Sequence, residues 1–111
     1  MEKIAQYQKI IKKTLDDYIL TMQSNLDEEI YLVEDLNKFN YLIYHNTWKH
    51  DSRSYGCILH VRIKNEKIYI EYDGTDEGFA DVFAELGISR QDIVLAFHAP
   101  AKRSYTGFAV A

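Results

Sequence analysis

The sequence predicts an α+β fold, in which an antiparallel sheet of about five strands in meander order packs against a long N-terminal helix and a second, shorter helix. Apolar residues recur every three or four positions over residues 2–22, which is the period of a helix. Apolar and polar residues alternate in several stretches between residues 30 and 73, which is the period of a strand. The helical period returns at residues 79–86. Residues 1–111 are expected to form a single domain with both helices on one face of the sheet.

The first helix is expected to bury one stripe of its surface against the sheet, because a long helix cannot bury an apolar stripe alone. Lys9, Lys12 and Lys13 lie mostly off that stripe and could form a phosphate-binding patch. Asp16 and Asp17 follow within a turn, so a solvated helix face is the preferred interpretation. A polar break is predicted at residues 23–27. The stripe consists of Ile4, Tyr7, Ile11, Leu15, Tyr18 and Met22.

Four strands in hairpin order are predicted after this break, at residues 30–33, 39–48, 54–64 and 68–73. The second is apolar on both faces, which is typical of a central strand or of one that carries an interface. In the third, Gly56 suggests a bulge or the close approach of another backbone. Asn65 suits the left-handed position of the tight turn that leads into the fourth strand. The core face of the third strand is assigned to Tyr55, Cys57, Leu59, Val61 and Ile63.

The switch from strand to second helix is predicted at residues 73–76. Gly74 permits a tight backbone, and Thr75 is expected to cap the helix. Asp76 and Glu77 are expected in its first turn, where the helix dipole favours negative charge. Gly87 ends the helix in the left-handed conformation.

The remaining chain is predicted to form one more strand and an ordered, apolar end. Ser89 and Asp92 resemble a capping box, and residues 93–97 form the last strand, which ends before Pro100. Residues 102–105 are a basic loop. The apolar residues 107–111 are expected either to be tucked into the domain or to contact another subunit.

Composition narrows the class of function. A net charge of −4 argues against a protein whose main task is to hold duplex DNA by its phosphates. The single cysteine, Cys57, fits a reducing cytoplasm and is read as a small buried hydrophobe. No apolar run approaches the roughly 20 residues of a membrane span. Nine tyrosines suit sheet faces that are partly wet or engaged by a partner. A homodimer is expected because the strand at residues 39–48 is apolar on both faces and the C-terminus is apolar.

Two clusters of polar residues could suggest catalysis or metal binding. His45 and His50 fall in the predicted connection between strands, but they lack the spacing of a metal site. A metal-dependent hydrolase could use Asp73 and Asp76 with His60 or His98. The turn and the helix dipole already explain those carboxylates, so the chain is interpreted as a protein without enzymatic activity, cofactor or metal.

An ordered series of segments runs along the chain. The segments are Asp73-Gly74-Thr75, Gly87-Ile88, residues 91–97 and residues 106–111, with Trp48, Arg53, Gly56-Cys57 and His60 upstream. Together they resemble the XisI family, the fdxN-element excision-controlling factors of cyanobacteria. The resemblance covers nearly the whole chain, and its specificity lies in the ordered series of segments.

This resemblance implies an accessory controlling factor for programmed excision of a DNA element by a site-specific recombinase. The factor would act by protein contact with an XisH-like partner, and it would touch nucleic acid indirectly or weakly. Direct nucleic-acid binding, with cations on phosphates and an aromatic ring on the bases, is the alternative. The candidate contact residues are Trp48, Arg53, His60, Arg62, Lys102, Arg103, Tyr105 and Phe108.

Overall fold

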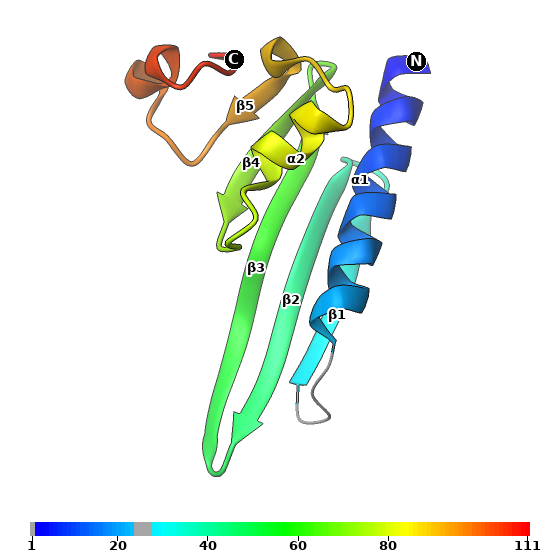
Figure 1. Ribbon diagram of the computed structural model, residues 1–111, viewed down its shortest axis with the longest axis vertical. Coiled ribbons are helices and arrows are strands. Elements are labelled where there is room, and N and C mark those ends of the chain that lie inside the picture. The colour runs from blue at the N-terminus through cyan, green and yellow to red at the C-terminus, as the bar shows by residue number, and fades with distance from the viewer. Residues whose placement is uncertain (1, 24–27) are drawn as a thin grey trace.

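The computed structural model describes residues 2–23 and 28–111, and it confirms the predicted α+β class (Figure 1). The polar break predicted at residues 23–27 lies almost entirely outside the described residues. The order of elements is α1 (Glu2–Met22), β1 (Glu28–Asp35), β2 (Asn40–Lys49), β3 (Ser52–Lys64), β4 (Lys67–Asp73), α2 (Phe79–Glu85), η1 (Arg90–Asp92), β5 (Ile93–Leu95) and η2 (Pro100–Tyr105), where η denotes a 3-10 helix.

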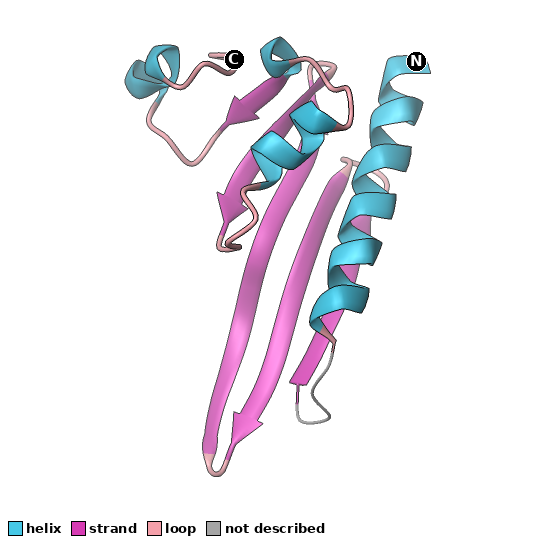
Figure 2. Cartoon of the chain, viewed as in Figure 1, coloured by secondary structure: helices cyan, strands magenta, loops and turns pink. Residues whose placement is uncertain are grey.

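The strands form one sheet in the order β1-β2-β3-β4-β5, and the sheet is mostly antiparallel (Figure 2). Strand β5 differs from the expected pattern, because it pairs parallel with β4. The chain crosses over through α2 before it returns to the sheet, and such a crossover leaves the next strand running in the same direction. Strand β5 also ends at Leu95 and not at Phe97 as predicted. The chain turns after Leu95, and the His98 amide donates to the Leu95 carbonyl at 3.1 Å.

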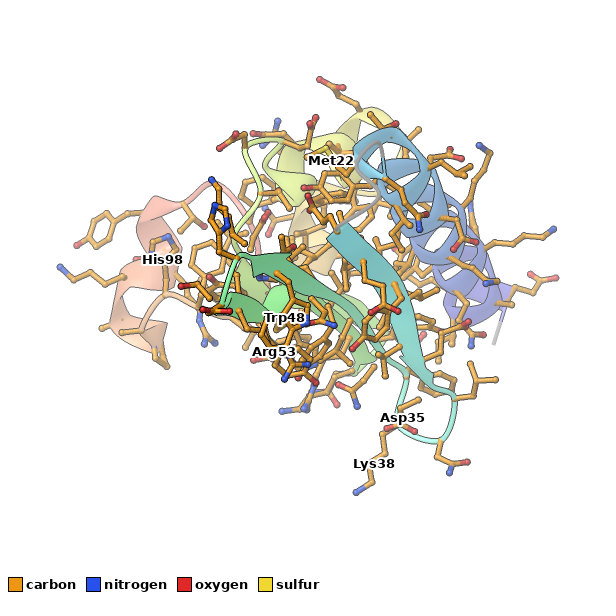
Figure 3. All side chains as sticks on the ribbon, turned by 90° about the horizontal axis from the view of Figure 1, so that it is seen from below. Met22, Asp35, Lys38, Trp48, Arg53 and His98 are labelled. Carbon is orange, nitrogen blue, oxygen red and sulfur yellow. The ribbon has the colours of Figure 1, made fainter. Side chains whose placement is uncertain are left out.

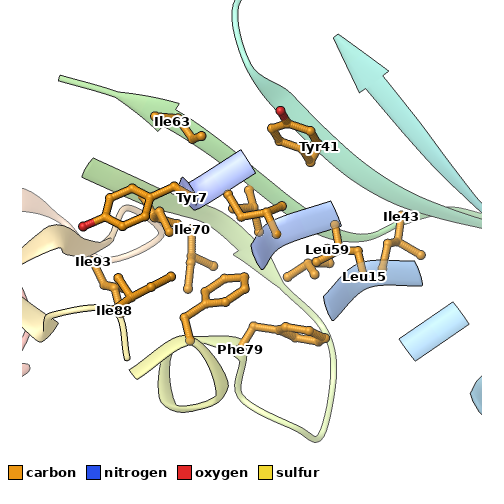
Figure 4. Packing of buried hydrophobic residues seen from close by; sticks show 14 of the residues in the cluster. Tyr7, Leu15, Tyr41, Ile43, Leu59, Ile63, Ile70, Phe79, Ile88 and Ile93 are labelled. Carbon is orange, nitrogen blue, oxygen red and sulfur yellow. The ribbon is translucent and has the colours of Figure 1, made fainter. Parts of the chain in front are cut away.

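Both helices lie on one face of the sheet, as predicted (Figure 3). The stripe of α1 contributes Tyr7, Ile11 and Leu15 to the core, and α2 contributes Phe79 and Phe83. Figure 4 shows three of them, Tyr7, Leu15 and Phe79, packed against residues of the sheet. The sheet residues that complete this core are Ile30, Tyr41, Ile43, Leu59, Val61, Ile63, Ile68, Ile70 and Ile93. No helix within the described ranges is long and apolar enough to cross a membrane.

A bulge in β3 reverses the predicted orientation of two residues. Tyr44 pairs with Cys57 and Ile43 pairs with Leu59, so Ile58 is an extra residue without an opposite partner. Tyr55 and Cys57 therefore lie on the face away from the helices, and their assignment to the core face was wrong. The bulge suggested by Gly56 occurs two residues further along. Cys57 is half-buried, and this burial raises the pKa of its thiol.

The start of α2 is held by Asp73 and not by Thr75. One carboxylate oxygen of Asp73 accepts hydrogen bonds from the Thr75 amide and hydroxyl at 2.9 and 2.6 Å, and the other accepts from the Phe79 amide at 2.9 Å. Asp73 reaches this amide because Gly78 adopts a left-handed conformation with φ of 70°. Asp76 and Glu77 precede the helix, so their predicted place in its first turn was wrong. The left-handed Gly87, with φ of 102°, is confirmed.

The turn η1 is tied to α1 by Asp92. The Tyr7 hydroxyl donates to the Asp92 carboxylate at 2.5 Å, and the Lys3 ammonium lies 2.9 Å from the same oxygen. Ser89 accepts from the Gln91 amide, but Asp92 faces α1 and does not complete the expected capping box. Burial raises the pKa of Asp92, but the hydrogen bonds from Tyr7 and Lys3 and the charge of Lys3 outweigh it, so the pKa is lowered.

Replacing Tyr7 by phenylalanine is expected to lower the free energy of unfolding by about 1.5 to 2 kcal/mol at pH 7, because the hydrogen bond goes to a charged group. The lowered pKa of Asp92 means that its contribution is present above roughly pH 4 and is lost as the pH falls below that value. The difference between the two proteins in urea melts should therefore shrink in acid. Tyr105→Phe, at a hydroxyl that is exposed, is the control. A difference that does not change with pH would contradict the assignment.

The apolar C-terminus is tucked onto the outer edge of β5. The Ala109 amide donates to the carbonyl of Ile93 at 2.8 Å and to that of Arg90 at 3.1 Å. Ala109 is buried and forms a small cluster with Tyr69 and Val94 on the face of the sheet away from the helices. The C-terminal residues are thus part of the domain. This agrees with the first of the two expectations from the sequence, that the apolar end is tucked into the domain.

Candidate functional site

The hairpin of β2 and β3 extends beyond the end of α1 as a projecting arm, defined here as residues 44–57 (Figure 1). The connection predicted around Trp48 is not a loop, because β2 continues to Lys49 and β3 begins at Ser52. Only His50 and Asp51 form the turn, with His50 at a positive φ of 58°. The tight turn keeps both strands paired to their ends, so their side chains are presented on two well-defined faces.

Aromatic side chains line the face of the arm that lies away from the helices. The Tyr31 and Tyr44 rings are stacked with centroids 6.3 Å apart, and Tyr44 lies 5.9 Å from Tyr55. The pKa of Tyr31 is raised, mainly by a side-chain hydrogen bond with Tyr55. We call the surface formed by Tyr31, Tyr44, Trp48, Arg53 and Tyr55 the tyrosine face.

Arg53 and Trp48, two of the predicted contact residues, lie opposite each other at the tip of the tyrosine face (Figure 3). The Arg53 guanidinium stands 5.6 Å from the Trp48 ring and 4.4 Å from the Tyr55 ring, at cation–π distance. It also donates to the Asn46 side chain at 2.7 Å, and Asn46 donates to Glu29 at 3.2 Å. The tyrosine face thus presents a row of rings with a positive charge on β3 and, beside it, the negative charge of Glu29 on β1.

His60 and Arg62 lie further along β3, on the same face of the sheet but away from the arm. A His60 ring nitrogen lies 2.9 Å from the Asn40 amide oxygen, and burial lowers the pKa of His60. Arg62 stands 3.5 Å from the Glu71 carboxylate. Both side chains are half-buried and engaged by neighbouring strands.

The remaining four candidates belong to the C-terminal segment. Arg103 donates to the backbone carbonyls of His98 and Ala96 at 3.0 and 3.2 Å, so it holds the loop together. Phe108 is half-buried, with the Arg90 guanidinium 4.8 Å from its ring, a contact that the sequence pattern did not indicate. Lys102 is exposed, and Tyr105 is 86% exposed. Of these four candidates, Lys102 and Tyr105 are therefore the two whose side chains are exposed to a partner.

The eight candidates therefore divide into separate groups. Trp48 and Arg53 lie on the arm, His60 and Arg62 on the middle of the sheet, and the last four on the C-terminal segment. The sequence indicated a tyrosine-rich face but not its membership, because the bulge at Ile58 decides that Tyr55 joins Tyr31 and Tyr44.

Among the acidic residues near α2, Asp73 has a structural role. Asp73 accepts three hydrogen bonds from the loop and the helix start. Asp76 and Glu77 are exposed beside it. Across residues 2–23 and 28–111, no group of three or more His, Cys, Asp or Glu side chains could hold a metal ion.

Comparison with known proteins agrees with the resemblance found in the sequence. The model of the XisI protein family matches residues 1–110. The chain belongs to the XisI family. Among curated proteins, none matches it significantly.

Two solved structures from this family resemble the chain over its whole length. A XisI-like protein from Anabaena variabilis ATCC 29413 is 36% identical, with a TM-score of 0.90 over 96% of this chain and 98% of that one. The fdxN element excision controlling factor XisI from the same organism is 34% identical, with a TM-score of 0.84 over 98% and 99% of the two chains. At these identities and coverages the fold is shared along nearly the whole chain.

Proposed function

We propose that this XisI protein is an accessory controlling factor for programmed excision of a DNA element by a site-specific recombinase. The observation that carries the proposal is the similarity, over nearly the full length of both chains, to a protein described as an fdxN element excision controlling factor. The chain acts through contact with an XisH-like protein. We place the protein in the cytoplasm, because a factor that controls excision works at the DNA. The single cysteine, Cys57, also suits a reducing cytoplasm.

The charge of the chain supports contact with protein in preference to DNA. The net charge is −4, and two of the four arginine and lysine candidates are already engaged, Arg62 by Glu71 and Arg103 by backbone carbonyls. Neutralising several phosphates requires a basic surface. A hydrolase that uses Asp73 is also disfavoured, because the Asp73 carboxylate already accepts three hydrogen bonds from the loop and the helix start.

The C-terminal segment is the surface that we assign to the XisH-like partner. Tyr105 projects from η2 into solvent, with Lys102 three residues before it and the exposed Phe97 and Val110 on either side along the chain. A tyrosine that is already held on an ordered segment supplies a large contact area at low entropic cost. Arg103 preorganises this surface through its bonds to the backbone.

Deleting the gene is expected to abolish excision of the element, measured by amplification of the rejoined junction. Restoring the unaltered chain should restore the junction, and Tyr105→Glu should not, because a charge would enter the partner contact. Leu20→Glu is the matched control, since Leu20 is 75% exposed near the far end of α1. Excision that continues at the normal rate without the gene would refute the proposed role.

The nature of the contact is tested by purifying the tagged protein together with the XisH-like protein, with and without nuclease. Retention of the partner after nuclease treatment, and its loss in Tyr105→Glu, is the expected result. If the partner disappears with the nucleic acid, direct nucleic-acid binding replaces protein contact as the mechanism. In that case, affinity should fall steeply with salt.

A further inference from the structure

The tyrosine face is exposed although it is built from large aromatic rings. Trp48 is 53% exposed and Tyr55 is 55% exposed, and Tyr72, further along the same face, is 50% exposed. Both helices lie on the other side of the sheet (Figure 3). The rings are nevertheless fixed, by stacking from Tyr31 through Tyr44 to Tyr55 and by the Arg53 guanidinium. Ordered, exposed aromatic rings with an arginine are typical of the centre of a protein interface.

Charge is distributed across this face in a directional way. Glu29 lies on β1, at one edge of the sheet, in the row that continues through Asn46 to Tyr55 on β3. The Arg53 guanidinium rests on the Tyr55 ring, so the positive end of the row lies on β3. Tyr44 lies on β2 in the adjacent row, paired with Tyr31 on β1 and Cys57 on β3. This face is therefore acidic on β1 and basic on β3, with Asn46 and Tyr44 between the two charges on β2.

A surface of this kind is complementary to itself under a two-fold rotation. Rotation by about 180° around an axis parallel to the strands places β1 of one copy over β3 of a second copy and leaves each row at the same height. Glu29 of each copy then faces the Tyr55 ring and Arg53 of the other copy. The two Tyr44 rings meet near the axis. A rotation about an axis across the strands would instead place the acidic β1 of one copy over the acidic β1 of the other.

We propose that the tyrosine face is the interface of a homodimer in which β1 of one copy lies over β3 of the other. Two Glu29 to Arg53 pairs flank the aromatic centre. Nucleic acid fits this face less well, since Glu29 would repel phosphates and the chain is acidic overall. The dimer does not depend on the XisH-like partner, whose assigned surface is the separate C-terminal segment.

The oligomeric state is measured by light scattering on the purified full chain, without the partner. The unaltered protein is expected to have about twice the chain mass of 13.0 kDa. Tyr55→Glu, at a half-exposed position, is expected to weaken self-association at least about 30-fold, the effect of losing an interface hot spot. Tyr105→Glu introduces the same change on the C-terminal segment and should leave the mass unchanged.

Charge exchange tests the alignment of the two copies. Glu29→Lys and Arg53→Glu should each weaken the dimer, and the two changes together should restore it. An unaltered chain that remains at 13.0 kDa, or a dimer that persists in Tyr55→Glu, overturns the interface. Single changes that weaken the dimer without rescue in the double variant overturn the alignment of β1 over β3.

Discussion

The Phe83→Ala variant is expected to lose about 3 to 5 kcal/mol of its free energy of unfolding, the usual cost of removing a buried phenylalanine ring. Phe83 is fully buried, and its ring lies 5.9 Å from that of Phe79, which contacts Tyr18 of α1 edge-on at 5.4 Å. The substitution therefore removes one of the two buried rings that α2 contributes to the core. Urea unfolding followed by circular dichroism measures the change.

The matched control for this variant is Leu86→Ala at the end of the same helix. Leu86 is 54% exposed, so the change is expected to cost no more than about 0.5 kcal/mol. Equal losses in the two variants would mean that α2 does not bury Phe83 as the structure describes. A total stability of about 5 to 15 kcal/mol is usual for a domain, so the Phe83→Ala protein should also melt at a clearly lower temperature.

The Asp73→Ala variant is expected to lose about 2 to 4 kcal/mol, because three donors lose their acceptor at once. The lost hydrogen bond to the Phe79 amide is expected to contribute most of this loss in stability. Phe79 is the first residue of α2, and its side chain is buried. Asp73→Asn keeps an acceptor oxygen and should lose roughly half as much. The same unfolding experiment measures both.

Asp76→Ala provides the control, since Asp76 is exposed in the loop before α2. It should be close to neutral, within about 0.5 kcal/mol. A larger loss of unfolding free energy in Asp76→Ala than in Asp73→Ala would contradict this assignment. It would favour the prediction from the sequence that Asp76 lies in the first turn of the helix. It would also reopen the possibility that Asp73 is held in place for chemistry and not for the turn.

The sequence predicted the elements whose signal is local. The helical stripe of α1 with Tyr7, Ile11 and Leu15, and the left-handed Asn65 and Gly87, agree with the structure. Each depends on residues within a turn or two of one another, whose spacing alone determines which face is apolar. The ordered segments around Asp73 and the last six residues also indicated the family that the full-length match shows.

The prediction for the two faces of β3 was wrong because it depends on contacts between distant residues. The alternation of apolar and polar residues in β3 predicted that Tyr55 and Cys57 lie on the core face. Without the bulge at Ile58 this prediction would be correct. One extra residue reverses the face of every position before it. The pairing of β3 with β2 produces this bulge, and the alternation of β3 alone carries no trace of it. The tyrosine face, and with it the dimer that we propose, exists because of that single residue.

The same distinction applies to the candidate contact residues and to the direction of β5. The sequence alone determined which residues are cationic or aromatic, which elements they belong to and which family they identify. Only the tertiary structure decided that Arg103 is used internally while Tyr105 is exposed, and that β5 runs parallel to β4. The physical reason is that local conformation follows from neighbouring residues. Exposure, pairing direction and the engagement of a charge are set by segments that meet only after the chain has folded.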